Sequence, residues 1–427
     1  MDKLLLKRTA IQSVALMIAV ITLSYALRQY SHPLISASDI GSAEAAAYHQ
    51  EENIVTAPME DIPQEPVKET VTPGNNEPDL MDAGLPGMLS NVDPEMIKEL
   101  GDKLLVIKKP LTEGLKMDLQ DIYITKSVKL IFNSSETYQL NEEDIGRIIR
   151  QDAFIGTPVF TETEEEVINQ KDGSTSTVIT KDYGNDIVHS ISFIHPDPSK
   201  HVTELTLELD TVYAHSIRED ETYYYIGLKK PSEVYDRILV LDAGHGGKDA
   251  GALSADESIY EKNINLGILL EVKELLDKED IKVYYTRLGD DKVFLRPRVE
   301  LANAVDCDYF ISIHSNASVS SKPSGTEIFY YGTNFKEVST KALATIFSEE
   351  IEKSTTLTNR GLIPMKKDDI FILNHANVPA ILIETGYMTS LKDITYLSQK
   401  VNQKAIAKGI YNGILRAYEE LKPADRN

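Results

Sequence analysis

The spacing of apolar and polar residues changes twice after an uncharged stretch near the start of this chain. Residues 9–27 carry no charged side chain and lie between Arg8 and Arg28. From about residue 103 to residue 230, apolar and polar residues alternate in short segments, which is the period of a half-buried β-strand. From Arg237 onward, short apolar runs alternate with segments in which apolar residues recur every three or four positions, as on one face of a helix. We therefore expect a membrane or signal segment, a β-rich module, and a domain that combines strands with helices.

The last domain has an alternation of strand and helix patterns. Strands are expected at residues 237–242, 282–286, 309–313, 325–331 and 380–384. Helices are expected at residues 260–279, 294–305, 336–353 and 400–421. Because strands that alternate with helices usually lie parallel in one sheet, this order predicts an α/β fold with a mostly parallel sheet flanked by helices.

The residue pattern in the segment before this domain predicts a β-rich module. Strand patterns fall at residues 104–107, 122–125, 127–132, 205–213 and 222–228. Two sites, Asp172-Gly173 and residues 183–186, have the composition of hairpin turns. Residues 142–151 are expected to form one helix.

The uncharged run near the N-terminus is long enough to cross a membrane. Residues 9–27, at ~1.5 Å each in a helix, span about 28 Å, close to the ~30 Å hydrocarbon core of a bilayer. The positive charges precede the run, which predicts a cytoplasmic N-terminus, a single membrane pass and an exported remainder. A signal peptide cleaved near residues 36–38 or 42–45 is the alternative, but its apolar region would be only about 7–15 residues. We therefore favour an uncleaved anchor.

Residues 31–95 differ sharply in composition from the rest of the chain. They contain 13 acidic residues, one basic residue and eight prolines. Such a segment cannot bury enough apolar surface to fold, so we expect a disordered linker. The expected organisation is a cytoplasmic N-terminus and anchor at 1–28, the linker at 29–98, the β-rich module at 99–232 and the α/β domain at 233–427.

Overall charge and cysteine content narrow the possible partners and chemistry. The net charge of −23 argues against nucleic acid as a partner. Cys307 is the single cysteine, which excludes a disulfide within the chain. Because it immediately precedes a predicted buried strand, we interpret it as a small core residue rather than a nucleophile.

Three predicted strands of the α/β domain end in residues that can do chemistry. His245 follows the first in a glycine-rich loop, His314 ends the third, and Glu384 ends the last. Parallel strands would bring these ends to one edge of the sheet. Two histidines and a carboxylate there suggest either a metal site or general acid–base chemistry.

A further carboxylate begins the first predicted helix. Glu261 precedes a mostly apolar stripe formed by Asn265, Ile268, Val272 and Leu275. A carboxylate that faces the core needs a partner, and a metal ion is one that would satisfy it. The alternative is a solvated first-turn residue favoured by the helix dipole. Because Glu261 lies in line with the apolar stripe, we favour its interpretation as a metal ligand.

Four blocks of sequence recur in order through this domain: DAGHGGKDAGA at 242–252, EK at 261–262 with NL at 265–266, SIHSNA at 312–317 and IETGY at 383–387, supported by Arg287, Arg298 and Arg360. These blocks resemble those of the zinc-dependent N-acetylmuramoyl-L-alanine amidases of type 3, a family of cell-wall hydrolases. The resemblance runs from about Arg237 to Leu421 and departs in small respects, with Asn374 where an arginine is frequent. Four ordered blocks are far more specific than any one of them.

The resemblance implies roles for individual residues. His245, Glu261 and His314 would be ligands of a zinc cofactor, and Glu384 would be the catalytic carboxylate. Asp249 and Asn316 are further residues that could brace the ligands or their loops. His375 matches none of the blocks, so we expect a structural or surface role for it.

The expected activity is hydrolysis of the amide bond between N-acetylmuramic acid and L-alanine in peptidoglycan, for cell-wall remodelling or daughter-cell separation. The expected partners are peptidoglycan and, through residues 9–27, the cytoplasmic membrane, with the catalytic domain outside; secretion after signal-peptide cleavage is the alternative. By position, the β-rich module is similar to wall-targeting domains of this family. Two alternatives are a zinc exopeptidase and a catalytically inert wall-binding scaffold. An inert relative would usually lack a ligand or the catalytic carboxylate, whereas all four positions are occupied here.

Overall fold

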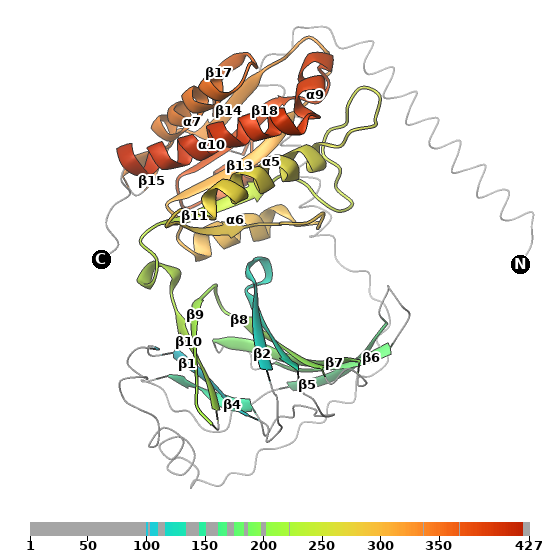
Figure 1. Ribbon diagram of the computed structural model, residues 1–427, viewed down its shortest axis with the longest axis vertical. Helices are drawn as coiled ribbons and strands as arrows, with labels where there is room; N and C mark the ends of the chain where they lie inside the picture. Colours follow the sequence, from blue (N-terminus) through green and yellow to red (C-terminus); the bar gives the residue numbers. More distant parts are fainter. Residues whose placement is uncertain are drawn as a thin grey trace, which may run out of the picture.

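The computed structural model in Figure 1 describes part of the chain. The described residues are 100, 103–109, 116–133, 145–150, 161–168, 175–182, 187–197, 202–221, 223–335, 337–366 and 368–421. The predicted anchor at 1–28 and the whole of the predicted linker at 29–98 lie outside them, so both remain predictions. Among the helices that are described, none is long and apolar enough to cross a membrane.

A six-stranded sheet forms the centre of the α/β domain. Its strand order is β12-β11-β13-β18-β14-β17, and every neighbouring pair is parallel except β14 with β18. The strands are β11 (Ile238–Ala243), β12 (Lys282–Tyr285), β13 (Tyr309–Asn316), β14 (Thr326–Tyr331), β17 (Asn359–Met365) and β18 (Ala380–Tyr387). The mostly parallel sheet expected from the sequence is confirmed. The reversal of β14 brings its first residues to the edge where β11, β13 and β18 end.

Helices cover both faces of this sheet. One face packs against α5 (Glu261–Leu276), α7 (Thr340–Ser354) and α10 (Lys400–Glu420), and Figure 1 shows these three helices crossing it side by side. The other face packs against α6 (Leu295–Ala304) and α8 (Phe371–His375). Because both faces are covered, the strands read as continuous apolar runs, and all residues of β11, β13 and β18 are buried.

The expected helices of this domain are confirmed, with one shifted boundary. The helix expected from residue 336 begins at Thr340, because β15 (Asn334–Phe335) and β16 (Val338–Ser339) pair before it. Besides β15 and β16, three elements of this domain were not predicted from the sequence: β17, α8 and the short helix α9 (Leu391–Leu397). The two helices are too short to show a clear helical period, and β17 is an edge strand of mixed burial.

The β-rich module is confirmed as two antiparallel sheets. Their orders are β4-β1-β10-β9 and β2-β3-β8-β7-β6-β5. The strands are β1 (Lys103–Lys108), β2 (Lys116–Ile122), β3 (Ser127–Asn133), β4 (Ile145–Arg150), β5 (Thr161–Ile168), β6 (Thr175–Asp182), β7 (Val188–Asp197), β8 (Val202–Leu209), β9 (Ala214–Glu219) and β10 (Tyr223–Lys229). The turn residues 172–173 and 183–186 lie outside the described residues, but the strands that flank each turn pair antiparallel.

Three predictions for this module differ from the structure. The helix expected at 142–151 contains β4 instead, which pairs with β1. Gly146 and the isoleucines around it favour a helix weakly, so the available strand partner decides the structure. The strand expected at 122–125 ends at Ile122 and continues as the 3-10 helix η2 (Tyr123–Thr125). The strand expected at 205–213 likewise ends earlier, at Leu209.

The η2 turn of the β-rich module packs against the α/β domain. The Tyr123 and Tyr284 rings pack edge-on with their centroids 4.7 Å apart, and Lys282 Nζ lies 3.3 Å from the Tyr123 hydroxyl oxygen. Lys282 is the first residue of β12, whose register partner on β11 is Ile238. The contact therefore lies at the end of the sheet opposite to His245, and Figure 1 shows the module beneath the α/β domain.

Candidate metal centre

His245 stands in a constrained loop directly after β11. Its φ of 61° lies in the left-handed region, which costs a non-glycine residue about 1 kcal/mol or more. Gly244 precedes it, and a Cβ at Gly244 would clash with the His314 ring. The loop must therefore have glycine at this position for the two histidines to approach each other.

Two buried arginines hold the backbone of this loop. Arg298 donates to the carbonyl oxygens of Ala243 at 2.8 Å and His245 at 3.0 Å. Arg287 donates to those of Ala243 and Gly244, both at 2.9 Å. These bonds offset the strain at His245 and fix the direction of its side chain.

A buried ion pair anchors the arginine clamp. Arg298 pairs with Asp242, which is 0% exposed and also accepts hydrogen bonds from Thr286 and Ser312. Burial raises the pKa of Asp242, but Arg298 and the two hydroxyl donors outweigh it, so the pKa is lowered overall. Asp242 is therefore ionised at neutral pH and depends on Arg298 for its charge partner.

Replacing Arg298 by Met should destabilise the α/β domain by about 3–5 kcal/mol, because the Asp242 charge would remain buried without its partner. Urea unfolding followed by circular dichroism measures this loss. The control is Arg416→Met, which removes a partly exposed arginine from the ion pairs of α10 and should cost about 1 kcal/mol or less. Equal losses in the two variants would show that the Asp242 pair does not hold the loop.

Glu261 faces the interior rather than solvent. Its exposed fraction is 4%, and it accepts hydrogen bonds from the backbone N–H groups of Ala252 at 2.8 Å and Ser315 at 3.0 Å. The Asn265 amide, one turn further along α5, donates to it at 3.1 Å. The expectation of a core-facing carboxylate is confirmed, and the solvated first-turn alternative is wrong.

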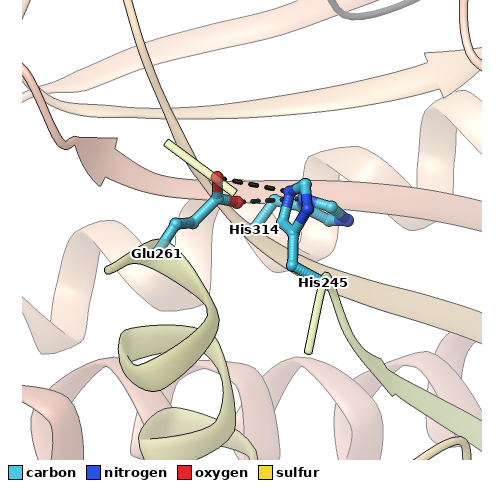
Figure 2. A group of neighbouring side chains, drawn as sticks. All are labelled: His245, Glu261 and His314. Atoms are coloured by element: carbon cyan, nitrogen blue, oxygen red, sulfur yellow. Dashed lines mark hydrogen bonds and ion pairs between the residues drawn. The ribbon is translucent and has the colours of Figure 1, made fainter. Parts of the chain in front are cut away.

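The Glu261 carboxylate faces both histidines from one side, as Figure 2 shows. Its Oε2 is 3.3 Å from Nε2 of His245, and its Oε1 is 3.1 Å from Nδ1 of His314. The two imidazole rings meet edge-on with their centroids 5.0 Å apart. One ligand atom from each of the three residues lies within 4.8 Å of the others, so the group could hold a metal ion.

Asp249 orients His245 from the outer side. Its Oδ2 lies 2.9 Å from Nδ1 of His245, which directs Nε2 toward Glu261. The bracing contact suggested for Asp249 is therefore present. Asn316 acts on the backbone instead: its side-chain oxygen accepts from the Ala317 N–H at 2.7 Å and so braces the loop after β13.

The charges of this group are strongly coupled. Burial raises the pKa of Glu261, but His245 and His314 outweigh it and hold the pKa well below its usual range. Burial lowers the pKa of His245, but Glu261 and Asp249 outweigh it and hold the pKa well above its usual range. Without a metal, a proton on His245 therefore compensates the negative charge of Glu261.

Glu384 lies on the strand next to His314. Its side chain is 0% exposed, and it is in register with His314 of β13 on one side and with Glu327 of β14 on the other. Residues in register on neighbouring strands share a face and lie about 5 Å apart. The structure therefore brings Glu384 to the same edge as the histidines, as the sequence predicted.

One charged residue at this edge was not predicted from the sequence. Glu327 is 4% exposed and receives hydrogen bonds from Arg360 Nε at 2.6 Å, the Tyr387 hydroxyl at 2.9 Å and the Asn316 amide at 3.0 Å. A single glutamate inside the apolar strand pattern at 325–331 was the available signal. Its partners come from three other strands and could not be inferred from spacing.

Two residues to which the sequence assigned no chemistry lie outside this group. Cys307 is 0% exposed in the core beneath the sheet, as expected for a small core residue. His375 ends α8, where its ring stacks on Phe371 at 4.0 Å and its Nδ1 lies 3.0 Å from the Phe371 carbonyl. His375 is exposed, and these contacts agree with the structural or surface role expected for it.

Comparison with known proteins agrees with the resemblance found in the sequence. Residues 239–416 match the family described as N-acetylmuramoyl-L-alanine amidase (Amidase_3). A germination-specific N-acetylmuramoyl-L-alanine amidase of Bacillus subtilis is 31% identical over 198 residues, which cover 43% of this chain and 81% of that protein. The chain therefore belongs to the N-acetylmuramoyl-L-alanine amidase family.

Two further relatives show how much of the chain this similarity covers. The probable cell wall amidase LytH of Staphylococcus saprophyticus is 35% identical over 184 residues, or 43% of this chain and 58% of that protein. The catalytic domain of CwlV, an amidase from Bacillus (Paenibacillus) polymyxa var. colistinus, is 33% identical over 44% of this chain and 99% of its own, with a TM-score of 0.40. The chain thus spans little more than half of LytH, and the family match leaves the β-rich module outside it.

Proposed function

We propose that the α/β domain hydrolyses the amide bond between the lactyl group of N-acetylmuramic acid and L-alanine in peptidoglycan. One observation carries the proposal: three metal-ligating side chains converge, and Glu384 lies in register with one of them on the adjacent strand. Membership of the amidase family supports the identity of the bond. Cell-wall remodelling or daughter-cell separation is the corresponding cellular role.

The donor set fits a zinc cofactor. Two imidazoles and one carboxylate form a typical catalytic zinc set, which leaves a fourth coordination position open. We propose that His245, Glu261 and His314 hold the ion. When bound, zinc supplies Lewis acidity that polarises the scissile carbonyl and lets water act as a nucleophile near neutral pH.

Glu384 would move the proton. Its carboxylate accepts a proton from the attacking water and then delivers it to the nitrogen of L-alanine as the C–N bond breaks. Because Glu384 and His314 are buried whereas the His245 side chain is 18% exposed, substrate must enter from the His245 side.

Digestion of purified peptidoglycan by the zinc-loaded full chain tests the proposal. The expected products carry new N-terminal L-alanine, with no new reducing sugar ends. Two other outcomes would replace the proposal. Cleavage restricted to free peptides would identify an exopeptidase, and wall binding without any new amino group would identify a scaffold.

Zinc affinity should rise as pH increases from 6 to 8. The raised pKa of His245 means that the ion must displace a proton at neutral pH, so affinity should increase up to about tenfold per pH unit until His245 is deprotonated. Competition with a chelator at several pH values measures this dependence.

Asp249→Asn is the matched variant for this measurement. It removes a carboxylate that raises the pKa of His245, so the pH dependence should become shallower. Loss of the carboxylate partner should also weaken zinc binding about 10–100-fold at high pH. Zinc affinity that stays constant between pH 6 and pH 8 would contradict the role of His245.

We also propose that the catalytic domain lies outside the cytoplasmic membrane, anchored by residues 9–27. The basic flank, the length of the uncharged run and the membership of a cell-wall hydrolase family support this topology. Protease added to intact, wall-stripped cells should remove the domain, and protection would contradict the topology. Release of a shortened chain into the medium would identify cleavage of a signal peptide instead.

A further inference from the structure

Arg360 is a partly exposed cation at the edge of the sheet that holds the candidate site. It lies near the start of β17, and its side chain is 37% exposed. The other two arginines around the site, Arg287 and Arg298, are buried and donate to backbone carbonyls. Arg360 therefore differs from them in presenting part of its guanidinium to solvent.

A buried anchor holds Arg360 in place. Its Nε donates to Oε1 of Glu327 at 2.6 Å, and its guanidinium carbon lies 5.5 Å from the centre of the Tyr387 ring. Oε2 of Glu327 is in turn held by the Tyr387 hydroxyl and the Asn316 amide. Contacts to one nitrogen and to a ring face fix the plane of the guanidinium, so little entropy is lost when its remaining donors bind a ligand.

The strand register places Arg360 within reach of a substrate at Glu384. Glu384 pairs with Glu327 across β18 and β14, and β17 follows β14 in the sheet. Two strand spacings separate the backbones of Glu384 and Arg360 by about 10 Å. A peptide that extends from Glu384 along the ends of these strands would bring its next residue to Arg360.

Substrate chemistry decides which group would meet this cation. In a muramoyl peptide the lactyl carboxyl is consumed in the amide, and the N-acetylated sugar is neutral. Any carboxylate must therefore lie on the peptide side of the scissile bond. A planar guanidinium with a fixed orientation suits such a carboxylate because it can donate two parallel hydrogen bonds.

We propose that Arg360, oriented by Glu327 and Tyr387, binds the free α-carboxylate of the second residue of the stem peptide. This inference rests on the proposed amidase function and adds a preference for stems with a charged second residue over stems in which that carboxylate is amidated. Arg360 binds substrate and takes no part in proton transfer.

The test compares two peptides and their muramoyl derivatives. Binding of L-alanyl-D-glutamate, with its γ-carboxyl blocked as a methylamide as in a longer stem, and of the corresponding α-amide is measured by calorimetry with the zinc-loaded full chain. The acid should bind about tenfold or more tightly, since a hydrogen bond to a charged group discriminates by at least that factor. The N-acetylmuramoyl forms should show the same ratio in kcat/KM, expressed mainly through KM.

Arg360→Gln should bring both ratios close to one, because it removes the cation that distinguishes the acid from the amide. Lys366→Gln, which removes an exposed cation just beyond the end of the same strand, should preserve both ratios. If Arg360→Gln does not fold, Arg360→Lys takes its place; it keeps a charge beside Glu327, loses the planar fork, and should lower the ratios several-fold.

The failures of the two proposals are distinguishable. A variant at Arg360 that keeps the preference for the acid, or that weakens acid and amide equally, overturns the carboxylate site while the amidase function stands. If the wild-type chain cleaves neither muramoyl form, the amidase function falls, and the binding ratio of the two peptides still decides the role of Arg360.

Discussion

Replacing Glu384 by Gln should lower hydrolysis of the muramoyl–L-alanine bond by about 10²–10⁴-fold, the range that general acid–base catalysis supplies. The substitution keeps the shape of the side chain and a hydrogen-bonding carbonyl but removes the oxygen that takes up the proton. Because Glu261 already supplies the carboxylate of the candidate metal group, zinc content and thermal stability should change little. Release of N-terminal L-alanine from peptidoglycan, zinc content and the melting temperature are the three measurements.

Glu350→Gln provides the control for this experiment. Glu350 is a mostly buried glutamate on α7 that pairs with Lys353 and Arg416, away from the site. Its replacement should leave turnover unchanged. If Glu384 instead served only to brace the core, Glu384→Gln would melt at a lower temperature and still turn over substrate. Full zinc occupancy with near-normal turnover would remove Glu384 from the mechanism.

Replacing His314 by Ala should abolish metal binding and activity together. His314 is 3% exposed, and one of its ring nitrogens is among the three converging ligand atoms. Loss of a group that only supports a ligand costs about 10–100-fold in metal affinity, so loss of a ligand should cost at least as much. Elemental analysis after gel filtration, together with the peptidoglycan assay, measures both effects.

The matched control is His375→Ala. This histidine stacks on Phe371 at the end of α8, which packs on the face of the sheet opposite to α5 and its Glu261. The variant should keep both zinc and activity. A His314→Ala protein that retains one zinc per chain and normal turnover would show that the metal group has been misassigned.

The α/β domain was predictable because its local and tertiary preferences agree. The apolar runs that end at Asp242, His314 and Glu384 are buried on both faces. An uninterrupted apolar run therefore indicates the strand, and the first polar residue after it marks where the apolar run stops. Parallel pairing then brings those ends together without further information. The β-rich module was less predictable. Residues 145–150 have weak local preference, and pairing with β1 makes them a strand.

The order of residues along the chain was enough to identify those that could bind a metal and the elements on which they lie. How these residues are held follows from contacts that exist only in the folded domain. The arginine clamp on the His245 loop joins residues more than 40 positions apart, and Glu327 meets Asn316, Arg360 and Tyr387 from three other strands. Hydrogen bonds depend on distance and direction between atoms, which residue spacing along a chain does not specify. The Glu327–Arg360 pair, on which the proposed carboxylate site rests, therefore depends on the placement of β14 and β17 beside β18.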